Sequence, residues 1–103
     1  MKFSNDEWRW ISVSLREIYH GIFDGISDPE QIFVLSLVDA GEDVLAMEQM
    51  SAYLLAGGRL CPPEVLPTFK ALAAKLGLLD NGFVRAVLQG RREMPPDSEL
   101  PPI

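Results

Sequence analysis

The sequence predicts an all-α protein: a compact, single-domain bundle of about five short helices, followed by a Pro-rich C-terminal tail. Three observations favour this fold class. Helix start signals recur along the chain, apolar residues repeat at the three- and four-residue spacing of a helix face, and no segment alternates as a half-buried strand does. The 103 residues are enough for one hydrophobic core but too few for two. We therefore expect a helical domain over residues 1–94 and an irregular tail over residues 95–103.

The first helix is predicted to begin after Ser4 and to end near residue 23. Ser4 can cap this helix, Glu7 can complete a capping box, and Phe3 can pack on Trp8 as a hydrophobic staple. One apolar stripe should face the core, and it consists of Trp8, Ile11, Leu15, Ile18 and Ile22.

The second helix follows a turn around Gly25. Asp28 suits its N-cap, Pro29 suits its first helical position, and Gln31 can complete a capping pattern with Asp28. The run from Ile32 to Val38 is apolar apart from Ser36, so its periodicity fits a helix or a strand, and the start signals favour a helix. Because this helix is apolar on most sides, we expect it to be the central one, wrapped by the others.

The third helix should lie between Gly41 and the pair Gly57-Gly58. Glu42 and Asp43 suit its N-terminus, where negative charge is favoured, and glycine readily closes a helix. Its apolar face is predicted to consist of Val44, Met47, Met50, Ser51, Leu54 and Leu55. The methionines could form an adaptable binding surface, but their helical spacing favours a place in the core.

A fourth helix is predicted to continue to Leu79 after a Pro-Pro connector. Pro67 requires this helix either to start at that residue or to be kinked in its first turn. Gly77 and the turn Asp80-Asn81-Gly82 are the stop signals. A short fifth helix should follow over residues 83–90.

The charge distribution is the most informative functional feature of the sequence. Residues 17–58 contain eight acidic residues and no Lys or Arg, a formal charge of −8. Residues 59–92 contain six basic and two acidic residues, a formal charge of +4. The net charge of −6 argues against general nucleic-acid binding, which requires a basic face, and suits a basic protein partner.

Sequence features also bear on location. The single cysteine cannot form an internal disulfide, which fits a reducing compartment. The N-terminus lacks the apolar core of a signal peptide, and no apolar run is long enough to span a membrane. We expect a cytoplasmic protein that does not act at a membrane.

Residues suited to catalysis are few. Glu17, His20 and Asp24 share one helix face and could in principle hold a divalent metal, but ligands from other elements are missing, so a solvated polar face is favoured. Cys61 has no neighbouring His and no CxxC partner, and a buried or half-buried thiol is the usual outcome. We expect no enzymatic activity, no metal and no cofactor.

Residues 37–80 carry a family resemblance. The stretch VDAGEDVLAMEQMSAYLL contains a glycine-acid turn and an LA-x-E motif, and PPEVLPTFKALAAKLGLLD contains a Pro-Pro-Glu helix start and an LGL close. In these features the chain resembles MafI-type immunity proteins, which are encoded beside secreted bacterial toxins. The resemblance implies a non-catalytic inhibitor that binds and neutralises the cognate toxin domain.

An acidic helical surface would suit such a partner. Many of these toxins are nucleases with basic clefts, which an acidic face can occupy with electrostatically accelerated association. The candidate partner-binding residues are Asp39, Glu42, Asp43 and Glu48 for charge, with Tyr53 or Trp10 as an aromatic anchor. Trp10 lies off the apolar stripe of its helix, so a neighbouring helix could instead pack on it.

Two other functions fit the same features. One is a homodimeric structural or regulatory module that pairs through the Met47 and Met50 face. The other is an acidic nucleic-acid mimic that blocks a DNA-binding protein, because carboxylates would face a basic cleft in that case too.

Overall fold

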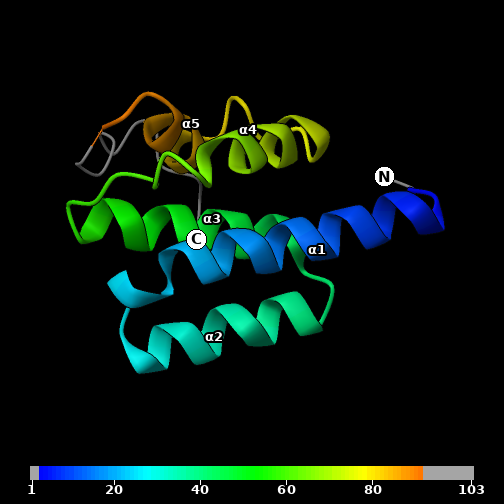
Figure 1. Cartoon of the computed structure of the whole chain (residues 1–103), viewed down its shortest axis with the longest axis horizontal. Coiled ribbons are helices and arrows are strands. Elements are labelled where there is room, and N and C mark those ends of the chain that lie inside the picture. The colour runs from blue at the N-terminus through cyan, green and yellow to red at the C-terminus, as the bar shows by residue number, and fades with distance from the viewer. Residues whose placement is uncertain (1–2, 92–103) are drawn as a thin grey trace.

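The computed structural model describes residues 3–91, which form five α-helices, one short 3-10 helix and no strand (Figure 1). The elements are α1 (Asn5–Ile22), η1 (Phe23–Gly25), α2 (Asp28–Asp39), α3 (Asp43–Ala56), α4 (Leu66–Lys75) and α5 (Gly82–Leu88). The prediction of an all-α, single-domain fold is confirmed for this part of the chain. The predicted Pro-rich tail over residues 95–103 lies outside the described residues.

The start of α1 follows its local sequence. The Ser4 hydroxyl accepts a hydrogen bond from the Glu7 backbone N–H, and the Glu7 carboxylate accepts one from the Ser4 N–H at 2.9 Å. The Phe3 and Trp8 rings pack edge to face with centroids 5.2 Å apart. Both the predicted capping box and the predicted staple are confirmed.

The start of α2 differs from the prediction by one residue. Ser27, not Asp28, is the N-cap, and it forms a second capping box with Glu30. Gln31, the expected partner of Asp28, instead donates hydrogen bonds to the carbonyls of Phe23 and Ile26. The Ser27 cap prevails because its partner three residues later is free to bond back to it.

The central helix is α3, so the prediction that the helix over residues 32–38 is central is wrong. α3 packs against α1, α2 and α5, whereas α2 lies at one edge of the bundle and α4 and α5 lie at the other (Figure 1). Met47 and Met50 of α3 are fully buried. On α2, Ile32 is 70% exposed and Phe33 is 43% exposed, because this helix packs against neighbours on one side only.

The α4 helix accommodates its proline and ends early. Pro67 lies in the first turn, where its missing N–H is not needed, so the helix starts at Leu66. α4 ends at Lys75 rather than at Leu79, because Gly77 takes a φ of 73° and the next N–H bonds back to the Ala73 carbonyl at 2.8 Å. Over the described residues, no helix has the length and apolarity needed to cross a membrane.

Candidate functional site

The tight turn between α2 and α3 brings three predicted site residues to one place. Gly41 has a φ of 74°, and the Glu42 N–H bonds back to the Leu37 carbonyl at 2.9 Å. This glycine closure reverses the chain within a few residues and starts α3 directly after α2. We call Asp39, Glu42 and Asp43 the acidic corner.

The three carboxylates of the acidic corner have different surroundings. Asp39 is exposed and pairs with Arg16 of α1 at 3.0 Å, so its charge is partly compensated within the chain. Glu42 is exposed and forms no hydrogen bond or ion pair with a described residue through its side chain. Glu42 is therefore the member of the corner that is most available to a partner.

Asp43 is the buried member of the acidic corner. It is only 8% exposed, and no described residue forms a hydrogen bond or ion pair with its side chain. Burial raises the pKa of the Asp43 carboxyl above its usual value, and the neighbouring Glu42 raises it further. The partial positive charge at the start of α3 acts in the opposite direction, because it favours the ionised form of Asp43.

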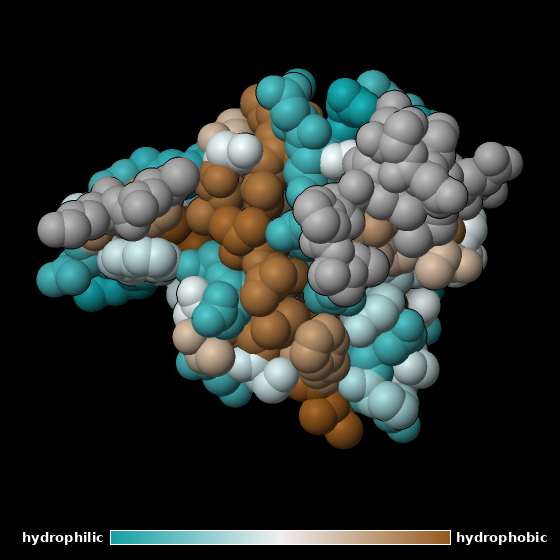
Figure 2. Space-filling view, turned by 180° about the vertical axis from the view of Figure 1, so that it is seen from behind, coloured by the Kyte–Doolittle hydropathy of each residue, from teal (hydrophilic) through white to brown (hydrophobic). Residues whose placement is uncertain are grey.

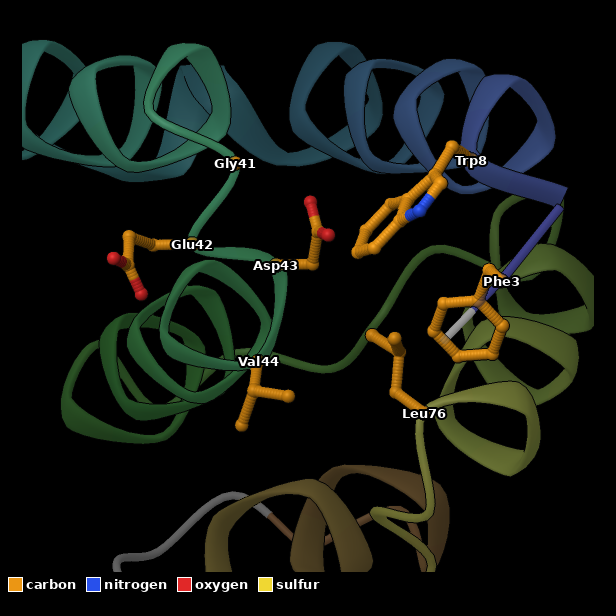
Figure 3. Close-up of a pocket in the computed structure, with 7 residues that line it drawn as sticks. All are labelled: Phe3, Trp8, Gly41, Glu42, Asp43, Val44 and Leu76. Atoms are coloured by element: carbon orange, nitrogen blue, oxygen red, sulfur yellow. The ribbon is translucent and has the colours of Figure 1, made fainter. Parts of the chain in front are cut away.

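Asp43 points into a pocket between α1, α3 and the end of α4 (Figure 3). The cavity has a volume of about 190 Å³. Figure 3 shows the Asp43 carboxylate directed toward the Trp8 ring, while the Glu42 carboxylate points away from it. The pocket is lined by Phe3, Trp8, Gly41, Glu42, Asp43, Val44 and Leu76.

The other predicted site residues of α3 lie apart from the acidic corner. The half-buried Glu48 accepts a hydrogen bond from Asn81 Nδ2 at 3.1 Å, and Asn81 also caps α5 through the N–H groups of Phe83 and Val84. Tyr53 follows Glu42 by eleven positions, roughly 16 Å along a helix. Glu48 thus has a contact within the fold, and Tyr53 is remote from the corner.

Trp10 lies beside a different hollow. It is 41% exposed, and it lines a cavity of about 350 Å³ together with Asp6, Glu7 and Lys75. Lys75 pairs with Glu7 and lies 5.5 Å from the centre of the Phe3 ring. Trp10 is therefore open to a partner, but the pocket that it lines is not the pocket at the acidic corner.

Exposed apolar side chains adjoin the acidic corner. Trp8, Val44 and Leu45 are between 40% and 46% exposed, although Trp8 and Val44 were predicted to face the core. Figure 2 shows apolar surface gathered in a band that crosses the bundle on this view. Protein interfaces commonly combine aromatic side chains of this kind with a polar rim.

The sequence predicted Phe3 and Trp8 as the staple of the first helix, and Trp8 also as part of the stripe that faces the core. In the structure, both side chains also line the pocket at the acidic corner, together with Leu76. The staple itself was the available signal, because it holds an aromatic pair at the start of α1, but nothing in the sequence places that end of α1 beside residue 43.

The residues with potential chemistry lie elsewhere. Glu17 accepts a hydrogen bond from the Thr68 hydroxyl at 2.9 Å, and His20 packs with Tyr19 and Phe23. Within residues 3–91, no group of three or more His, Cys, Asp or Glu is arranged to hold a metal ion. Burial raises the pKa of the Cys61 thiol to about 11, which opposes formation of a nucleophilic thiolate at neutral pH.

Comparisons with protein-family models, with curated proteins and with solved structures found no match to this chain. The resemblance of residues 37–80 to MafI-type immunity proteins therefore stays a hypothesis drawn from the sequence.

Proposed function

We propose that this protein is a cytoplasmic immunity protein that binds and neutralises a cognate secreted bacterial toxin through the acidic corner. The observation that carries the proposal is the pair of carboxylates without partners among the described residues, Glu42 and Asp43, beside exposed Trp8 and Val44. Carboxylates that the fold leaves uncompensated are available to attract and orient a basic surface.

The partner we propose is the toxin domain itself, most simply a nuclease with a basic cleft. Residues 17–58 contain eight acidic residues and no Lys or Arg, so this part of the chain is negatively charged. Part of that charge is used within the fold, because Glu30 caps α2, Asp39 pairs with Arg16 and Glu48 holds Asn81. Within the acidic corner, Glu42 and Asp43 are the carboxylates that form no hydrogen bond or ion pair with a described residue.

Co-expression tests the proposal. The probe is the C-terminal domain of the protein encoded immediately upstream, produced with and without this chain, with cell survival as the first measurement. Calorimetry on the purified pair then gives the affinity at low and high salt. Survival with tight binding that weakens in salt is expected. An affinity that does not change with salt concentration would contradict the acidic corner as the interface. Failure to rescue the cells and to bind the toxin domain would contradict the immunity function.

A homodimer is the second candidate, and the exposed side chains of α2 favour it. The predicted pairing face is wrong, because Met47 and Met50 are fully buried and cannot meet a second copy. Ile32 and Phe33 are the exposed apolar pair that a dimer would bury instead. Light scattering of the wild type and of Ile32→Glu tests this: a dimer that the variant converts to a monomer would support the second candidate.

A further inference from the structure

The pocket at the acidic corner contains a buried carboxylate without a partner. Asp43 is 8% exposed, and none of residues 3–91 forms a hydrogen bond or ion pair with its side chain. Buried charges are normally paired, because removing an unpaired ion from water is costly. The Asp43 carboxylate faces an open cavity rather than the core, so a ligand can reach it (Figure 3).

The walls of the pocket suit the stem of a long side chain. Phe3, Trp8 and Leu76 form one side, and the edge-to-face packing of the two aromatic rings holds them in place. The cavity of about 190 Å³ is large enough for several water-sized groups, so it has room for the stem and the cationic head of one Arg or Lys side chain.

We propose that this pocket receives one arginine or lysine side chain of the protein partner, with its stem against the apolar walls and its cation on Asp43. The inference rests on the proposed function and deepens it, because it names where a basic residue of the toxin is anchored. Asp43 supplies a charge-assisted hydrogen bond, and the Trp8 ring supplies a cation–π contact. A partner cation would thereby satisfy the carboxylate that the free protein leaves unpaired.

A small probe tests the pocket without the toxin. n-Butylguanidinium carries the stem and the cation of an arginine side chain, and n-butylurea has the same stem without the charge. Titration of the isotope-labelled protein is followed by the indole N–H signals of Trp8 and Trp10 in nuclear magnetic resonance spectra. We expect a saturable shift of Trp8 with a millimolar Kd for n-butylguanidinium, and no comparable shift with n-butylurea or at Trp10.

Two variants make the test specific. Asp43→Asn keeps the shape of the side chain and removes its charge, and we expect it to weaken n-butylguanidinium binding about tenfold. Asp6→Asn makes the same change beside Trp10 and should leave the affinity unchanged. Circular dichroism checks that both variants fold. Equal binding of the two probes, or undiminished binding by Asp43→Asn, would overturn the proposal.

The toxin measurement separates the two hypotheses. If the toxin domain binds and Asp43→Asn weakens that binding about tenfold, both hypotheses are supported. Toxin binding that is insensitive to Asp43→Asn would contradict the pocket and retain the immunity function. Probe binding without any affinity for the toxin domain would contradict both the anchoring of a toxin residue and the proposed function.

Discussion

Asn81 connects α5 to α3, and its removal gives a prediction whose size follows from the structure. Its Oδ1 atom accepts hydrogen bonds from the N–H groups of Phe83 and Val84 at 3.1 and 3.2 Å. Its Nδ2 group donates to the Glu48 carboxylate at 3.1 Å. Asn81→Ala therefore removes a helix cap and an interhelical hydrogen bond together.

The expected loss is about 2 kcal/mol of the free energy of unfolding. The cap contributes about 1 kcal/mol, and a half-buried hydrogen bond to a carboxylate contributes about 1 kcal/mol. Glu48→Ala removes only the hydrogen bond to Asn81 and should cost about 1 kcal/mol. Glu48→Gln keeps an acceptor oxygen and should cost close to nothing.

Urea unfolding of Asn81→Ala, of Glu48→Ala and of the variant that carries both changes measures these free energies. The double-mutant cycle should return a coupling energy of about 1 kcal/mol between Asn81 and Glu48, with unchanged m-values. The same cycle decides the role of Glu48. A coupling energy of zero between Asn81 and Glu48, together with a loss of toxin affinity in Glu48→Gln, would refute a structural role for Glu48. Glu48 would then belong to the toxin interface.

Three further predictions concern stability. Gly21→Ala should cost about 1–2 kcal/mol in urea unfolding, because its Cβ would lie 2.2 Å from Val65 Cγ2. Gly57→Ala should cost less, because the nearest atom to its Cβ is the Tyr53 carbonyl oxygen at 3.3 Å. The hydrogen bond from Lys75, with that from the Ser4 N–H, lowers the pKa of Glu7 from 4.5 to about 2. The ionised Glu7 carboxylate therefore stabilises the fold above pH 4.5, and this stabilisation is lost as the pH falls toward 2. Between pH 4.5 and pH 2, the free energy of unfolding of Glu7→Gln should therefore fall less than that of the wild type. An equal fall in the two proteins would contradict a stabilising role of the Glu7 carboxylate. The raised pKa of Asp43 has the opposite effect on stability. Asp43 contributes most to the free energy of unfolding below its unfolded pKa of 3.8, and this contribution declines as the pH rises through the folded pKa. Asp43→Asn should abolish that decline.

Local sequence signals predicted the helices well because their causes are local. The Ser4–Glu7 capping box and the glycine that ends α3 act over a few neighbouring residues, so each can be recognised in a short stretch. The choice of the central helix is a property of the whole bundle. The apolar run of α2 resembled a buried helix, but α1 and α3 pack directly against each other and leave Ile32 at the surface.

The candidate site was only partly predictable for the same reason. The charge pattern identified an acidic half of the chain, but the use of each carboxylate depends on residues far away in sequence. Asp39 meets Arg16 across 23 positions, and Glu48 meets Asn81 across 33 positions. The sequence showed that Asp43 suits a helix start, whereas its burial beside Trp8 depends on how α1 docks on α3.

The central claim is that the acidic corner binds a basic toxin domain, and a charge reversal at Glu42 tests it most directly. Calorimetry would compare the wild type, Glu42→Lys and the matched control Glu64→Lys against the C-terminal domain of the protein encoded immediately upstream. Glu42 and Glu64 are both exposed, and both variants change the net charge equally. We predict that Glu42→Lys weakens binding about tenfold at low salt and less at high salt, while Glu64→Lys has little effect. Equal affinities for the three proteins at low salt would contradict the claim.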